Sequence, residues 1–235
     1  MKNSISFQLT GRYALFTDPI TKTGGEKCSY PIPTYEAIKG VLKSIYWKPT
    51  FIWYVDRIRV MNTIRTQTKG TKPLAWRGGN SLAIYNFLHN VAYQIDAHFE
   101  WNHHRPELTD DRIDGKHYAM AKRLLEKGGR QDIFLGVRDC QGYVEPCEFG
   151  EGRGDYDDHT NPLSFGLMFH SFDYPDETGG NELHSNFWQP VIKQGIIECI
   201  RPQACPHKCF VREIQVKRFL LNKNINMVDR EEISS

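Results

Sequence analysis

Hydrophobic and polar positions alternate near the start of the chain and then change to a helical period. Residues 4–17 begin with every second position apolar, which predicts a β-strand. From Pro33-Thr34 onward the apolar residues recur at intervals of three and four and form one stripe, made of Ile38, Val41, Leu42 and Ile45. This spacing predicts a helix that begins at Pro33-Thr34 and ends before Pro49.

The two periods recur further along the chain. Residues 51–61 are dense in aromatic and β-branched residues and predict a second strand, and residues 91–99 alternate like a third. A second helix is expected over residues 116–127, closed by Gly128-Gly129, with a strand over residues 133–137 after it. The resulting order, β-α-β followed by β-α-β, is typical of the ferredoxin-like fold.

The pattern changes after Cys147. A loop rich in Gly and Asp is followed by three stretches that read as strands, at residues 164–172, 191–200 and 210–220, and by a polar tail over residues 222–235 that we expect to be mobile. We therefore expect an α+β protein of two domains. We expect residues 1–148 to form a ferredoxin-like domain and residues 149–235 to form a small antiparallel β-sheet domain with a polar tail.

Composition and charge narrow the class of protein. The 235 residues carry a net charge of +2, and no stretch approaches the roughly 18 apolar residues that a membrane span requires. The first residues also lack the continuous apolar run of a signal peptide. We therefore expect a soluble, cytoplasmic protein, whose six cysteines are free thiols.

One segment of the chain is strongly basic, although the net charge of the whole chain is close to zero. Between Arg57 and Arg77 there are basic residues and no acidic ones. Cations neutralise phosphates and aromatic rings stack on bases, so the segment is consistent with nucleic-acid binding as well as with a solvated surface loop. The candidate RNA-binding residues are the basic residues of this segment, the tryptophan within it and two lysines of the first predicted helix: Arg57, Arg59, Arg65, Lys69, Lys72, Trp76, Arg77, Lys39 and Lys43.

The start of the second helix departs from local rules. Asp114 is a plausible N-cap, which would place Lys116 and His117 in the first turn, where cations are unfavourable. An ammonium and an imidazole beside free helix N–H groups can form a phosphate site with its own proton carrier. The simpler interpretation is that Lys116 and His117 are two exposed polar residues at the end of a helix. For Tyr46, near the end of the first predicted helix, the simpler interpretation is a tyrosine at the boundary of the core.

Metal chemistry is a weaker alternative. Cys199, Cys205 and Cys209 with His207 superficially suggest zinc, but they form only one cluster. The acidic loop made of Asp155, Asp157 and Asp158 could serve a metal-dependent DNA nuclease, although one acidic loop does not establish such a site. We expect no cofactor and no metal.

Several short motifs in order resemble one known family. They are Phe7 to Gly11, Pro33-Thr34-Tyr35-Glu36-Ala37 leading to Tyr46, Gly115-Lys116-His117, Phe134-Leu135-Gly136-Val137-Arg138-Asp139-Cys140 and Asp173-Tyr174-Pro175. The chain resembles, over nearly its whole length, the CRISPR-associated endoribonuclease subunit of the type I-C (Dvulg subtype) interference complex, Cascade.

The resemblance implies that the ferredoxin-like domain is similar to the RNA-recognition motif, and it implies a function. Such proteins bind the hairpin of a CRISPR repeat transcript, cut the precursor RNA near the 3′ base of the hairpin without a metal, and stay on the 5′ handle of the mature guide RNA with the other Cascade subunits. The family's catalytic tyrosine and Lys-His pair match Tyr46, Lys116 and His117 here. The alternative is a scaffold subunit that holds the 5′ handle without cutting.

Overall fold

The protein was analysed as a computed structural model, which describes residues 3–73, 78–79, 81–214, 220 and 223–224. It is a mixed helix and strand structure whose paired strands run antiparallel, as the predicted α+β class requires. Three sheets are present among the described residues, and the largest has seven strands.

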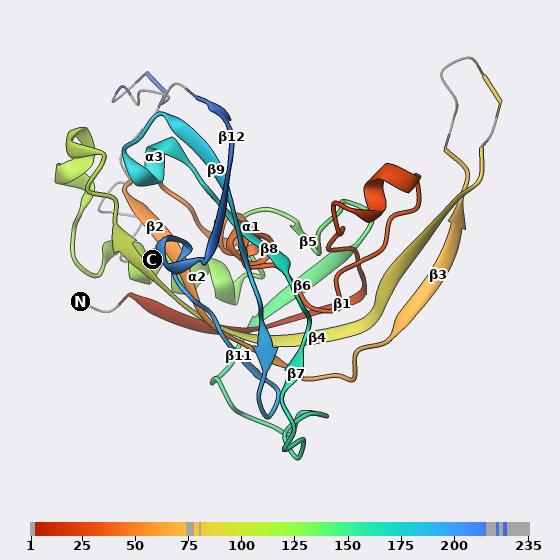
Figure 1. Cartoon of the computed structure of the whole chain (residues 1–235). Coiled ribbons are helices and arrows are strands. Elements are labelled where there is room, and N and C mark those ends of the chain that lie inside the picture. The colour runs from red at the N-terminus through yellow and green to blue at the C-terminus, as the bar shows by residue number, and fades with distance from the viewer. Residues whose placement is uncertain (1–2, 74–77, 80, 215–219, 221–222, 225–235) are drawn as a thin grey trace.

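The large sheet has the strand order β11-β2-β4-β1-β6-β5, and β3 pairs with an outer part of β4. Its strands are β1 (Ser4–Ala14), β2 (Phe51–Val60), β3 (Thr66–Thr71), β4 (Ala83–Trp101), β5 (Ile133–Phe134), β6 (Gln141–Pro146) and β11 (Ile196–Glu198). The hairpin of β3 and β4 extends beyond the rest of the sheet as an arm (Figure 1).

Two helices cover one face of this sheet. The helices are α1 (Tyr35–Ile45) and α2 (Lys116–Glu126), which contact each other as well as the sheet (Figure 1). Thr34 is the N-cap of α1, and its hydroxyl accepts a hydrogen bond from the N–H of Ala37 at 3.2 Å. The predicted apolar stripe of α1 is buried against the sheet.

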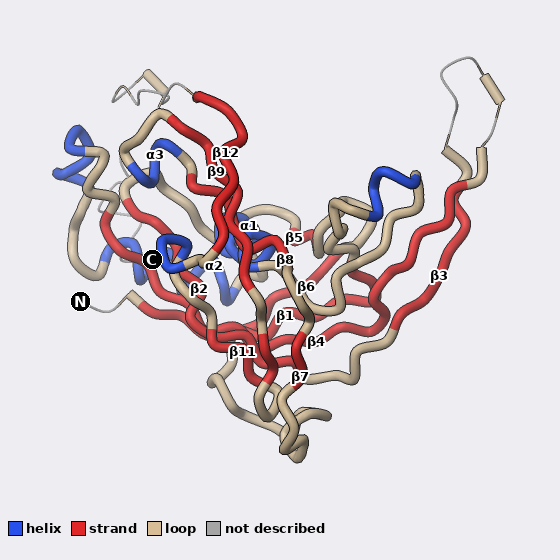
Figure 2. Tube along the Cα trace, in the orientation of Figure 1, coloured by secondary structure: helices blue, strands red, loops and turns tan. Residues whose placement is uncertain are grey.

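The C-terminal part contributes smaller sheets. One has the order β12-β9-β8 and the other pairs β10 with β7. Their strands are β7 (Leu163–Ser164), β8 (Met168–Asp173), β9 (Glu182–Trp188), β10 (Val191–Ile192) and β12 (His207–Glu213), and the short helices of the chain are η1 (Thr21–Gly24), η2 (Pro106–Asp111), α3 (Pro175–Thr178) and η3 (Pro202–Ala204). Since α1 contacts both β2 and β8, this helix lies between the large sheet and the three-stranded one (Figure 2).

Several predicted elements need correction. The N-cap of α2 is Gly115 and not Asp114, because the backbone reverses there with φ of 77°. The basic segment between Arg57 and Arg77 is not only a surface loop, since β3 forms within it. The strand predicted over residues 133–137 shrinks to β5. The strand that pairs with β1 on the side away from β4 is β6, which the apolar pattern did not reveal.

The C-terminal predictions are corrected in the same way. The stretches at 164–172 and 191–200 each divide into two short strands, and β9 was not predicted. Strand β11 leaves the C-terminal part to pair with β2, so the large sheet contains strands from both sides of the predicted boundary at residue 148. The tail predicted over residues 222–235 lies outside the described residues, apart from 223–224.

Candidate active site

The three predicted catalytic residues come from two elements that meet beside the sheet. Tyr46 follows the last turn of α1, where its extended backbone (φ −159°) ends the helix. Lys116 and His117 begin α2. The phenolic oxygen of Tyr46 lies 2.9 Å from Nδ1 of His117, although the two residues are 71 positions apart in the chain.

Neighbouring groups hold this pair in place. The indole N–H of Trp53 donates to the backbone carbonyl of Tyr46 at 2.8 Å. The rings of Phe51 and Trp101 pack against the His117 imidazole, with centroid distances of 5.3 and 5.6 Å. Aromatic walls and a fixed backbone therefore leave the tyrosine and the histidine little freedom.

Asp111, at the end of η2, connects the two residues of α2. Its Oδ1 accepts a hydrogen bond from Nζ of Lys116 at 2.7 Å, and its Oδ2 accepts one from the hydroxyl of Thr50 at 2.6 Å. Its backbone oxygen lies 2.7 Å from Nε2 of His117. The apolar pattern could not identify Asp111 or Thr50, because neither belongs to a motif or to a periodic face.

These contacts determine a tautomer. A backbone carbonyl only accepts hydrogen bonds, so Nε2 of His117 carries a hydrogen toward Asp111. In the neutral ring Nδ1 is then the acceptor, and the O–H of Tyr46 donates to it. The arrangement can therefore pass a proton from the phenol to the imidazole.

The charge of Asp111 is also determined by its partners. Burial by itself raises the pKa of this carboxyl, but the hydrogen bonds from His117, Lys116 and Thr50 outweigh burial and hold the pKa well below its usual range. Asp111 is therefore a carboxylate at neutral pH, and it neutralises the ammonium of Lys116.

The whole cluster is closed to solvent in this structure. The exposed fractions are 2% for Tyr46, 3% for Lys116, 0% for His117, 2% for Asp111 and 0% for Thr50. The segment between β4 and α2, residues 102–115, contacts the cluster through Asp111 and otherwise carries many exposed side chains, so we call it the cover. A substrate can reach the cluster only if part of this cover moves.

The predicted RNA-binding residues have different environments. Lys39 is buried and its ammonium is bonded to the Glu177 carboxylate in α3, which Lys43 also contacts at 3.2 Å. Arg59 is buried too, where it pairs with Asp157 at 2.6 Å. The charges of Lys39 and Arg59 are therefore neutralised inside the protein.

The remaining basic residues lie nearer the surface. Arg57 pairs with Asp96 at 2.6 Å. Lys69 lies in β3 on the β3–β4 arm, and its ammonium is 3.3 Å from the centre of the Tyr13 ring of β1. Arg65 and Lys72 are exposed at the two ends of β3. Trp76 and Arg77 lie outside the described residues.

The candidate metal ligands are not gathered into a site. Within the described residues, no group of three or more His, Cys, Asp or Glu side chains could hold a metal ion. In the acidic loop, Asp155 accepts hydrogen bonds from Thr63, and Asp158 pairs with Arg153. Burial raises the pKa of the Cys205 thiol to about 11, which favours the protonated form that binds metals poorly.

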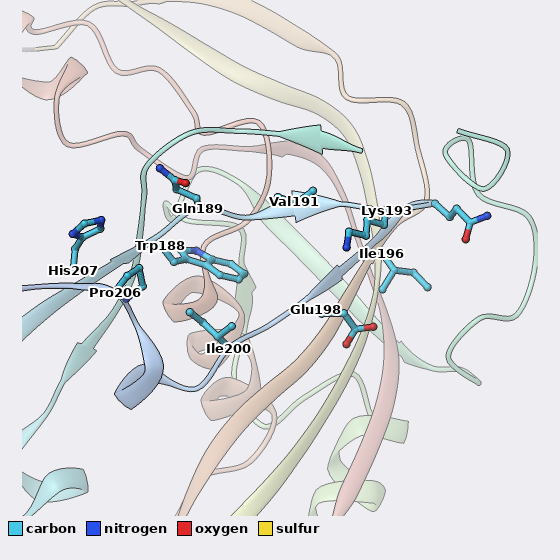
Figure 3. Close-up of a pocket in the computed structure, with 10 residues that line it drawn as sticks. Trp188, Gln189, Val191, Lys193, Ile196, Glu198, Ile200, Pro206 and His207 are labelled. Atoms are coloured by element: carbon cyan, nitrogen blue, oxygen red, sulfur yellow. The ribbon is translucent and has the colours of Figure 1, made fainter. Parts of the chain in front are cut away.

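A separate hollow lies in the C-terminal part. It has a volume of about 670 Å³, and the residues around it come from β9, β10, β11, the start of β12 and the loops between these strands (Figure 3). Apolar residues such as Trp188, Val191 and Ile196 line it beside Lys193 and Glu198. None of the described lining residues belongs to the predicted site. Across the described chain, no helix is both long and apolar enough to cross a membrane.

Comparisons of sequence agree on one group of proteins. The model of a family described as CRISPR-associated protein (Cas_Cas5), the Cas5d type, matches residues 4–200. A Thermus thermophilus protein named CRISPR pre-crRNA endoribonuclease Cas5d is 30% identical over 175 residues, which cover 70% of this chain and 73% of that protein. A protein of the same name from Mannheimia succiniciproducens is 28% identical over 232 residues, covering 84% and 95%.

Solved structures are similar over most of their length. A crystal structure of a CRISPR-associated protein is 32% identical, has a TM-score of 0.72, and matches 88% of this chain and 96% of its own. A functionally uncharacterized protein from Streptococcus mutans gives a TM-score of 0.69 at the same identity and coverage. The overall arrangement of helices and sheets is thus shared with solved proteins.

Proposed function

This chain belongs to the Cas5d family of CRISPR-associated proteins, and we propose that it is an endoribonuclease that cuts precursor CRISPR RNA within the repeat. The observation that carries the proposal is the 2.9 Å contact between Tyr46 and His117 with Lys116 beside it. This constellation supplies a proton acceptor and a cation, which are the groups that RNA cleavage by its own 2′-hydroxyl requires.

The proposed mechanism uses these three side chains in order. Tyr46 takes the proton of the 2′-hydroxyl while its own proton passes to Nδ1 of His117, so the phenol need not ionise alone at its usual pKa near 10. The 2′-oxygen attacks phosphorus, and Lys116 neutralises the charge that develops on the phosphorane. The bond to the 5′-oxygen breaks, and the imidazolium of His117 returns a proton to that oxygen. The products are a 2′,3′-cyclic phosphate and a 5′-hydroxyl.

No step of this mechanism uses a metal ion, because RNA contains its own nucleophile and the side chains handle the protons. We further propose that the protein binds the hairpin of the repeat, cuts near its 3′ base, and remains on the 5′ handle of the guide RNA with the other type I-C Cascade subunits. The cytoplasm, where the transcript is made, would be its location.

We propose in addition that residues 1–148 form a ferredoxin-like RNA-processing domain. Two features support this. The inner strands run in the order β6-β1-β4-β2, and α1 and α2 follow β1 and β4 in the chain and contact each other. Residues 149–235 would then form the smaller β-sheet domain, with β11 extending the sheet of its neighbour.

The proposal can be tested with a labelled RNA that carries the CRISPR repeat of the same genome. In excess EDTA the protein should cut this RNA at one position. Tyr46→Phe and His117→Ala should each lower the single-turnover rate by about 100-fold or more, because each removes a proton-transfer group, and Tyr46→Phe should change the Kd for RNA little.

A repeat with a 2′-deoxy sugar at the cut site is the matched control substrate. It should bind normally and stay intact. Cleavage of this substrate would contradict 2′-hydroxyl attack, and binding of the repeat without any cleavage would favour the scaffold alternative. Activity that depends on added metal would support the metal-dependent nuclease instead.

A further inference from the structure

We propose that Thr50, Lys116 and His117 form a binding site for one phosphate of the RNA backbone, and that the Asp111 carboxylate occupies this site until RNA displaces it. The identity of the ligand rests on the proposed function. The site itself rests on the geometry around Asp111.

The donors around Asp111 are those that a phosphate needs. One carboxylate oxygen receives the Lys116 ammonium at 2.7 Å, and the other receives the Thr50 hydroxyl at 2.6 Å and lies 3.3 Å from Nε2 of His117. Ammonium, hydroxyl and imidazole groups are common partners of phosphate oxygens. A phosphodiester, like a carboxylate, carries one negative charge on two exposed oxygens. Either anion can therefore accept from the Lys116 ammonium and the Thr50 hydroxyl, and a phosphate can also accept from Nε2 of His117 once the backbone carbonyl of Asp111 has moved away.

The buried charge of Lys116 favours exchange of the Asp111 carboxylate for a phosphate over departure of the carboxylate alone. Lys116 is buried, and an ammonium left there without a counter-ion is strongly unfavourable. If Asp111 leaves as a phosphate arrives, the ammonium keeps one anionic partner throughout. Removal of Asp111 without a replacement would instead leave a buried, unpaired cation.

The position of Asp111 in the chain connects this exchange to the opening of the site. Asp111 lies in the cover formed by residues 102–115, whose regular structure is limited to the six-residue 3₁₀ helix η2, interrupted by non-helical backbone at Leu108. A segment of this kind unfolds locally more readily than the strands and helices around it. Its outward movement would expose Tyr46 and His117 and withdraw the carboxylate from the donors in one event.

The test compares Asp111→Asn with Asp110→Asn, which makes the same change in charge at the exposed residue next to it. Asp111→Asn should bind both the repeat RNA and inorganic phosphate about tenfold more tightly than the unaltered protein, because the competing anion is gone. Asp110→Asn should change both affinities less than twofold. Adding Thr50→Val to Asp111→Asn should abolish the gain for phosphate, since one donor is lost.

Tryptophan fluorescence can report phosphate binding, because Trp101 contacts the His117 ring. Unchanged or weaker binding by folded Asp111→Asn would overturn the proposal and make Asp111 a residue that only positions Lys116. If Asp111→Asn does not fold, Leu108→Ala replaces it: loss of the buried Leu108 side chain loosens the cover and should also tighten phosphate and RNA binding. No tightening in that variant would likewise overturn the proposal.

The phosphate measurement does not depend on cleavage. If the unaltered protein binds repeat RNA but never cuts it, the proposed enzyme activity fails, while tighter phosphate binding by Asp111→Asn still supports the anion site. If the unaltered protein cuts RNA but Asp111→Asn gains no affinity, the enzyme proposal stands and the exchange fails.

Discussion

The positive charge of Lys39 is placed in the interior, beside the carboxylate of Glu177. Lys43, one turn further along α1, contacts the same carboxylate but is 31% exposed. Burial raises the pKa of Glu177, yet the two lysines outweigh it and lower that pKa overall. At the scale of single residues, one carboxylate therefore joins α1 to α3.

Replacing one partner of this pair should destabilise the protein. We expect Lys39→Met to lower the free energy of unfolding by about 3 kcal/mol, because it leaves part of the Glu177 charge buried without compensation. Lys43 is only partly buried, so Lys43→Met is the matched control and should lower the free energy of unfolding by about 1 kcal/mol or less. Urea denaturation measures both. A stable Lys39→Met variant that binds repeat RNA poorly would instead give Lys39 the RNA-binding role predicted from the sequence.

At the scale of elements, the start of α2 determines where Lys116 and His117 point. Gly115 adopts φ of 77° as the N-cap, and no side chain caps the helix there. This left-handed conformation is easy for glycine and unfavourable for most other residues. The reversal of the chain at Gly115 therefore brings the first turn of α2 back under the segment that contains Asp111.

Gly115→Ala should strain this turn because alanine disfavours the left-handed φ of this position. No neighbouring atom obstructs a Cβ there, so the backbone conformation is the only source of strain. We expect a loss of about 1–2 kcal/mol in the free energy of unfolding, together with slower RNA cleavage as Lys116 and His117 shift. Gly115→Asn is the control, because asparagine tolerates the left-handed region better. Equal effects of the two substitutions, by thermal melting and single-turnover cleavage, would contradict the conformational explanation.

At the scale of the whole molecule, His170 of β8 connects helix α1, which covers the large sheet, to the C-terminal strands. Its ring stacks on Tyr35 of α1 at 4.2 Å and meets Trp188 of β9 edge-on at 5.0 Å. Its Nε2 lies 3.1 Å from the carbonyl oxygen of Ile200. Burial lowers the pKa of His170 to about 4, so the folded protein keeps this ring neutral.

Stability should therefore fall as the pH is lowered. The unfolded chain takes up a proton at His170 near pH 6.5, whereas the folded protein does so only near pH 4. The contribution of this residue is complete above pH 6.5 and decreases between pH 6.5 and 4, by about 3 kcal/mol in total. His170→Gln should flatten this part of the pH dependence in urea denaturation, and the exposed His207→Gln should not. An equal slope in both variants would exclude His170 as the origin.

Local sequence by itself determined the elements whose signal lies in neighbouring residues. The alternation in β1, the stripe of α1 and the start of this helix at Pro33-Thr34 each depend on side chains within a few positions, so local sequence predicts them correctly. The matching motifs also indicated the family, because they appear in order along the chain. That inference was confirmed by the family match over residues 4–200.

Only the tertiary structure decided which distant residues meet. Strand β6 carries a weak apolar pattern and is a strand because β1 offers it a partner, and β11 crosses into the large sheet for the same reason. The burial of Lys39 and the closure of Asp111 over Lys116 and His117 likewise depend on contacts between segments. Local propensity cannot encode such contacts, because pairing and burial are determined by residues far apart in the chain.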